Sequence, residues 1–196
     1  MIRILLRLAF LGVVVVLLLV VLGYAELLVW PAQHRAAMAD TIPSCGGRVV
    51  AEGVTYKFTD PDEGDVVVIH AARNTDGTII PDKDATDIDL VLRVSAGPDD
   101  EVVGRDGAVF VNNVKIDDIR TAPFPLVKLG GDQYFVLGDN RSATIDSRTF
   151  GPVLRDAIYA RALLVVWPLR DFGLLRSPDV TPGTKSTPPP GPSVCN

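Results

Sequence analysis

The polar segment from Gly138 to Gly151 has the composition of a chemical site rather than of a core strand. It follows the apolar run Gln133–Leu137 and combines carboxylates, guanidinium groups, an amide and several hydroxyls. When such groups are buried they need partners, and pairing of Asp146 with Arg148 or Arg141 would provide them. The segment, termed here the polar box, therefore predicts either a functional site or a turn held together by its own ion pairs.

Few other groups in the chain are suited to chemistry. The two histidines, His34 and His70, lie far apart, and the two cysteines, Cys45 and Cys195, form no CxxC pair, so a zinc site has almost no support. We expect neither a metal nor a cofactor. The cysteines form one disulfide or remain two free thiols. A formal charge of −5 argues against a nucleic-acid partner, which usually requires a basic surface.

An apolar block at the N-terminus predicts a membrane anchor. The stretch from Leu8 to Trp30 is long enough for a bilayer core, which takes roughly 20 apolar residues in a helix. Arg3 and Arg7 precede it, which places the N-terminus in the cytoplasm and the rest of the chain outside the plasma membrane. The alternative is a signal peptide cleaved after Ala25. The apolar sequence resumes after that residue, which favours a retained single-pass anchor.

The remainder of the chain has the pattern of an all-β domain. Short Val-, Ile-, Phe- and Tyr-rich runs alternate with turn residues, and no long helical period appears. Asp106-Gly107 and Asn112-Asn113 predict tight turns, and the polar stretch 74–89 predicts a solvated loop. The predicted strands are Arg48–Ala51, Val66–Ile69, Asp89–Val94, Ala108–Val111 and Gln133–Leu137.

These patterns divide the chain into four parts. Residues 1–7 form the cytoplasmic N-terminus and residues 8–30 the transmembrane anchor. Residues 31–176 form the β domain, and residues 177–196 form a proline-rich tail that we expect to be disordered.

The polar box resembles the G-D-N-R-x-x-S-x-D-S-R-x-x-G motif of bacterial type I signal peptidases, with Thr144 in place of the first serine. The positions that carry the resemblance are Gly138, Asp139, Asn140, Arg141, Thr144, Asp146, Ser147 and Arg148. Further similarity lies in Gly64–Val68, Arg93-Val94, Asp106–Asn112 and Val165–Pro168. The resemblance implies a signal-peptidase-like antiparallel β ectodomain on one N-terminal transmembrane helix.

The same resemblance implies a serine nucleophile and a lysine general base, and this sequence has neither where the family places them. Ala37 occupies the serine position and Leu92 the lysine position, before Arg93-Val94. Asp40 replaces a proline, and Arg35 stands where a serine often assists the oxyanion hole. Alanine cannot attack a carbonyl and leucine cannot accept a proton, so the sequence predicts a pseudo-protease.

Three functions remain open from the sequence. A pseudo-protease of this family could still bind signal peptides of exported proteins by strand addition, alongside an active paralogue. The alternative is an active extracytoplasmic serine endopeptidase that processes signal peptides with a relocated nucleophile, for which Ser44 is a weak candidate. A third possibility is a structural partner in an envelope complex, contacted through the tail.

Overall fold

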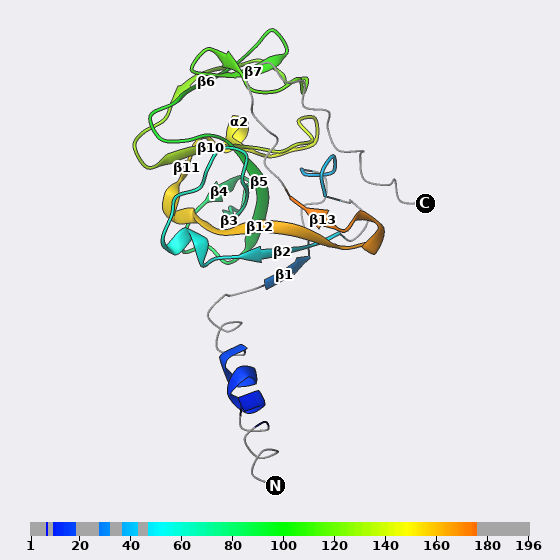
Figure 1. Cartoon of the computed structure of the whole chain (residues 1–196). Helices are drawn as coiled ribbons and strands as arrows, with labels where there is room; N and C mark the ends of the chain where they lie inside the picture. The colour runs from blue at the N-terminus through cyan, green and yellow to red at the C-terminus, as the bar shows by residue number, and fades with distance from the viewer. Residues whose placement is uncertain (1–6, 8–9, 19–27, 32–36, 43–46, 176–196) are drawn as a thin grey trace.

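Two antiparallel β-sheets make up the described β domain in the computed structural model (Figure 1). The structure describes residues 7, 10–18, 28–31, 37–42 and 47–175. The strands are β1 (Leu28–Pro31), β2 (Arg48–Glu52), β3 (Val66–Arg73), β4 (Ile79–Pro81), β5 (Ile88–Ala96), β6 (Glu101–Arg105), β7 (Ala108–Val111), β8 (Val114–Lys115), β9 (Phe124–Lys128), β10 (Gln133–Leu137), β11 (Val153–Leu154), β12 (Ile158–Trp167) and β13 (Gly173–Leu174). The helical turns are η1 (Thr55–Lys57), α2 (Ser147–Phe150), η2 (Arg155–Ala157) and η3 (Leu169–Asp171).

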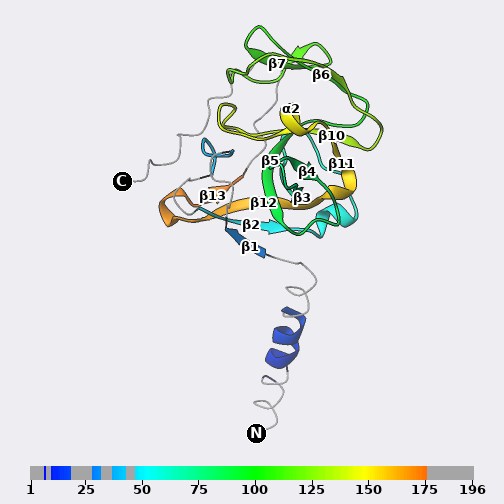
Figure 2. The same cartoon turned by 180° about the vertical axis from the view of Figure 1, so that it is seen from behind.

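The larger sheet holds most of the core. Its strands follow the order β1-β2-β12-β3-β5-β10-β11, with β4 added to β3 and β13 to β12. Val67, Val68 and Ile69 in β3 are completely buried, as expected for a central strand covered on both faces. The smaller sheet, β8-β7-β6-β9, lies at the end of the β domain opposite β1 (Figure 2). The predicted all-β architecture is confirmed.

Local sequence accounts for the hairpins of the smaller sheet. Asp106 and Gly107 join β6 to β7 with φ angles of 52° and 76°, and Asn112 and Asn113 join β7 to β8 with φ angles of 49° and 65°. Asp, Asn and Gly tolerate this left-handed backbone better than other residues do, which is why they favour two-residue hairpins. Both predicted turns are confirmed.

The prediction of a loop over residues 74–89 was partly wrong. Within this polar stretch, Ile79–Pro81 forms β4 and pairs with Ala71–Arg73 of β3, and Ile88 and Asp89 already belong to β5. A turn closed by the bond from the Asn74 amide to the Thr78 carbonyl, 2.9 Å long, reverses the chain. The strand is only three residues long, so its alternation was too short to be visible as a period.

The N-terminal region is described only in part. Residues 10–18 are helical, and their large apolar side chains are exposed. In the part of the chain that the structure describes, no helix has the length and apolar character needed to cross a membrane. Strand β1 pairs with β2 and takes up residues 28–30, which the sequence analysis assigned to the anchor. Residues 23–25, both cysteines, Arg35, Ser44 and the tail 177–196 lie outside the described residues.

Candidate functional site

The polar box is closed by the ion pair between Asp146 and Arg148. Arg148 Nε and Nη2 donate to the two carboxylate oxygens of Asp146, each at 2.8 Å. The Asp146 side chain is completely buried and also accepts from the backbone amides of Arg148 at 3.1 Å and Gly138 at 3.2 Å. The carboxylate therefore caps the start of α2 and holds both ends of the box together. The predicted pairing of Asp146 with Arg148 is confirmed.

The other arginine of the box, Arg141, connects it to the loop after β8. Its buried guanidinium group donates to the Thr121 hydroxyl at 2.7 Å, to the Gly138 carbonyl at 3.1 Å and to the Asp117 carboxylate. Ser147 connects the box to the large sheet, since its hydroxyl accepts from the Val136 amide in β10 at 3.0 Å. The box thus joins the two sheets.

Asp139 connects the box to β5. Its carboxylate accepts from Arg93 Nε at 2.8 Å and from Arg93 Nη2 at 2.7 Å, and it also accepts from the Thr41 hydroxyl. Arg93 further donates to the Gly64 carbonyl at 2.7 Å. Because Arg93 follows Leu92, the strand segment that carries Leu92 is fixed directly to the box.

Ala37 is docked on the box through its main chain. Its carbonyl accepts from the Asn140 amide at 3.0 Å and from the Thr144 hydroxyl at 3.3 Å. A Cβ atom on Gly138 would lie 2.6 Å from the same carbonyl and 2.2 Å from the Thr144 hydroxyl. Only glycine leaves room for this contact, so the box and the segment 37–42 are fitted to each other.

The Leu92 side chain is part of the apolar core. It is only 1% exposed, pairs across the sheet with Val67, and belongs to the same buried cluster as Ala37 and Met38. Asp40, in contrast, is exposed. The structure therefore places both sequence-predicted positions, 37 and 92, in the same buried apolar cluster, with an apolar residue at each.

No lysine in the described part of the chain is buried. Lys57, Lys83, Lys115 and Lys128 are all exposed, and the last three form ion pairs with Asp84, Asp118 and Glu101. The hydrogen bond that Lys83 donates to the Asp84 carboxylate raises the pKa of Lys83, whereas a general base needs a lowered pKa. These four lysines are surface charges rather than candidates for a general base.

Part of β5 has one edge without a strand partner among the described residues. Strand β3 pairs with β5 from Ile88 to Arg93, whereas β10 pairs only with Arg93, Val94 and Ala96. The segment Ile88–Leu92, termed here the open edge, therefore has no strand on that side among the described residues. Ile88 and Asp89 are partly exposed, whereas Leu90, Val91 and Leu92 are buried. The open edge ends at Leu92, one residue before the ion pair with the box.

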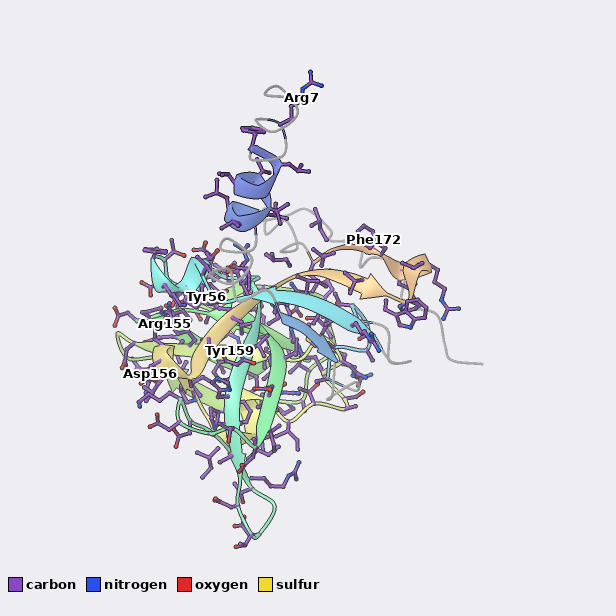
Figure 3. All side chains as sticks on the ribbon, turned by 90° about the horizontal axis from the view of Figure 1, so that it is seen from below. Arg7, Tyr56, Arg155, Asp156, Tyr159 and Phe172 are labelled. Atoms are coloured by element: carbon purple, nitrogen blue, oxygen red, sulfur yellow. The ribbon has the colours of Figure 1, made fainter. Side chains whose placement is uncertain are left out.

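A second polar cluster, on the neighbouring strands, was not found from the sequence. His70 Nδ1 lies 3.0 Å from Asp89 Oδ1, and the Tyr159 hydroxyl donates to the same oxygen at 3.1 Å. The rings of His70 and Tyr159 are stacked with centroids 3.7 Å apart (Tyr159 is labelled in Figure 3). Burial, and then the neighbouring Asp89, raise the pKa of Tyr159. Strand register brings these residues together, and nothing in their sequence spacing indicates it.

Comparison with known proteins gives the family. The family model described as signal peptidase, peptidase S26, matches residues 6–167. A probable signal peptidase I-2 from Synechocystis is 35% identical over 133 residues, and the match covers 65% of this chain and 58% of that protein. A mitochondrial ATP-independent inner membrane protease subunit 1b from Arabidopsis thaliana is 30% identical over 145 residues, with 72% of each chain covered.

A solved signal peptidase I from Enterococcus faecalis superposes with a TM-score of 0.41 at 22% identity, covering 53% of this chain and 97% of that one. The family match spans both the segment containing Ala37 and the polar box, the two parts that the structure joins. The chain belongs to the signal peptidase family of S26 peptidases.

Proposed function

We propose that this protein is a non-catalytic signal-peptidase-like protein that binds exported peptide segments without cleaving them. One observation carries the proposal: the open edge of β5 ends at Leu92, where an apolar residue fills the position at which the family motif has a lysine. The site thus offers a template for an extended peptide but lacks a base beside it.

The argument against cleavage is chemical. The methyl group of Ala37 cannot form an acyl bond, and Leu92 cannot accept the proton of any neighbouring hydroxyl. Thr41 and Thr144 supply hydroxyls near Ala37, but the first donates to Asp139 and the second to main-chain carbonyls. Since the described lysines are exposed, none has the apolar surroundings that would lower its pKa toward neutrality.

The argument for binding comes from the sheet. An extended peptide that adds to the open edge gains main-chain hydrogen bonds, and these do not require a nucleophile. The edge is held in place by the Arg93–Asp139 ion pair on one side and by the full pairing with β3 on the other. An edge that is fixed before binding has less conformational entropy to lose when the peptide docks.

The proposed location is the outer face of the plasma membrane, with the anchor in the segment that precedes β1. Four apolar side chains near the end of β12 and in η3 and β13 are at least half exposed: Trp167, Leu169, Phe172 and Leu174. Leu174 of β13 is paired with Leu164 of β12, which is also paired with Val50 of β2. Val50 in turn is paired with Val29 of β1. The exposed group therefore lies across the sheet from the strand that follows the N-terminal segment, where a lipid surface would cover it.

The test uses the full-length protein in lipid nanodiscs and a fluorescent peptide with an Ala-x-Ala end. We expect saturable binding by anisotropy and no cleavage product by mass spectrometry. Peptides methylated on alternate backbone nitrogens provide the control, because strand addition uses the N–H groups of every second residue. One methylation register should abolish binding, and the other should leave it intact.

Two results would overturn the proposal. The absence of binding by any such peptide would exclude the peptide-binding function. Cleavage that disappears in the Ser44→Ala variant would instead establish the active endopeptidase with a relocated nucleophile.

A further inference from the structure

Three polar side chains form one row across adjacent strands and end at the open edge. Tyr159 in β12 stacks on His70 in β3, and His70 is in direct cross-strand register with Asp89 in β5. Asp89 belongs to the segment Ile88–Leu92, which pairs with β3 on one side only among the described residues. The next place in this row is therefore the residue of an added strand that lies opposite Asp89.

The Asp89 carboxylate has unused acceptor capacity. His70 Nδ1 and the Tyr159 hydroxyl both approach Oδ1, at 3.0 Å and 3.1 Å. A carboxylate has two oxygens and about four lone-pair sites, so these two contacts leave Oδ2 able to accept a further donor. The Asp89 side chain is 27% exposed, which makes it reachable but only partly screened by water.

We infer that Asp89 is a specificity-determining residue, which selects peptides with a basic side chain opposite it and rejects those with an acidic one. This inference rests on the proposed peptide-binding function and names the substrate class of the same edge. Residues directly opposite on neighbouring strands have Cβ atoms about 5 Å apart, within reach of a lysine or arginine side chain. The stacked rings of His70 and Tyr159 fix the carboxylate from the other side.

The expected difference in Kd between lysine and glutamate peptides follows from the energies of cross-strand charge pairs. An opposite charge across two strands contributes up to about 1 kcal/mol, which corresponds to a change in Kd of about fivefold. A like charge directly opposite is disfavoured by a comparable factor, so lysine and glutamate peptides should differ by about tenfold or more. Neighbouring peptide positions point to the other face of the sheet and should show no such difference.

The experiment is a charge scan on the full-length protein in nanodiscs, at about pH 8, where histidine is ordinarily neutral. An alanine-rich peptide carries lysine or glutamate at each position in turn, and anisotropy gives Kd for each pair. We expect the lysine peptide to bind more tightly at one position only. In Asp89→Asn, which keeps the shape and a carbonyl oxygen, this preference should fall to less than about twofold.

Matched variants keep the test decisive. Asp106→Asn makes the same charge change in the β6–β7 turn, at a left-handed position that asparagine tolerates, and should leave the preference intact. Asp89→Thr is a second neutral variant with a better strand former, for use if Asp89→Asn folds poorly.

Each outcome bears on a different statement. If no peptide binds, the proposed function fails and the inference fails with it. If peptides bind but no position prefers lysine over glutamate, or if the preference survives in both neutral Asp89 variants, the inference alone is overturned.

Discussion

Arg93 and Asp139 lie 46 positions apart in the sequence and meet in a two-pronged ion pair, with N–O distances of 2.8 Å and 2.7 Å. Their side chains are only 13% and 10% exposed. A planar guanidinium group matched to a carboxylate in this way fixes orientation as well as distance. The pair therefore sets the position of β5, and of Leu92 beside it, relative to the polar box.

Removal of Asp139 should destabilise the fold strongly. In Asp139→Ala, the largely buried Arg93 would lose the carboxylate that accepts from it twice, and breaking a buried pair from one side costs about 3–5 kcal/mol. The measurement is the free energy of unfolding from urea titration. The control is Asp84→Ala, which removes the exposed Lys83–Asp84 pair and should cost far less, because water screens an exposed pair. Equal losses in the two variants would contradict the role given to the Arg93–Asp139 pair.

A methyl group at Gly138 should displace the segment that carries Ala37. In Gly138→Ala the new Cβ would meet the Ala37 carbonyl and the Thr144 hydroxyl, and overpacking of this kind costs about 1–3 kcal/mol. Hydrogen exchange of the Asn140 amide, which donates to the Ala37 carbonyl, should become faster. Gly131→Ala is the matched control, since its Cβ would meet nothing within 4 Å. Unchanged protection at Asn140 would show that the contact is loose.

A lysine introduced at position 92 should make stability depend on pH. Leu92 is 1% exposed, so burial in Leu92→Lys would lower the lysine pKa in the folded state. The unfolded chain would keep its proton up to about pH 10.4, and the folded chain would lose it earlier. The free energy of unfolding should therefore rise with pH between the lowered pKa and about 10.4, by about 1.4 kcal/mol per unit.

The control for this variant is Leu92→Met, which conserves volume and carries no charge. It should cost less than about 1.5 kcal/mol at every pH. If the free energy of unfolding of the lysine variant were equally independent of pH, its amine would have reached water. The site around position 92 would then be more open than the structure shows.

Stability should also fall at high pH because of Tyr56. Burial, and then the Asp65 carboxylate that accepts its hydroxyl at 2.9 Å, raise the pKa of Tyr56 in the folded state. The unfolded phenol ionises near pH 10, so the folded state is favoured fully below that pH and loses this advantage above it. In Tyr56→Phe the free energy of unfolding should fall less steeply with pH above about pH 10, by about 1.4 kcal/mol per pH unit. An identical slope in both proteins would show that the phenol ionises freely.

Sequence pattern predicted the parts of the fold that depend on neighbouring residues. The runs beginning at Val66, Ala108 and Gln133 are strands as expected, because apolar β-formers between turn residues leave little alternative. The turn at Asp106-Gly107 follows from the backbone freedom of those two residues. Asp146 and Arg148 are two positions apart, so their pairing could be expected without knowledge of the fold.

Contacts that depend on strand register could not be predicted in the same way. Arg141 binds Asp117 and Thr121, and His70 meets Asp89, only because the sheets align segments that are distant in sequence. The short strand β4 was hidden for a different reason, since three residues are too few to show a period. The positions of Ala37 and Leu92 came from the family motif, while their burial became apparent only with the folded chain.

The contacts of Arg141 have a consequence for what an intact box indicates in this chain. Because the guanidinium group connects the box to the loop at Asp117 and Thr121, most substitutions at Arg141 would loosen the junction between the sheets whether or not a reaction takes place. The box of this chain is therefore needed for its fold whatever groups stand at positions 37 and 92. An intact box indicates the architecture, while activity has to be judged at positions 37 and 92.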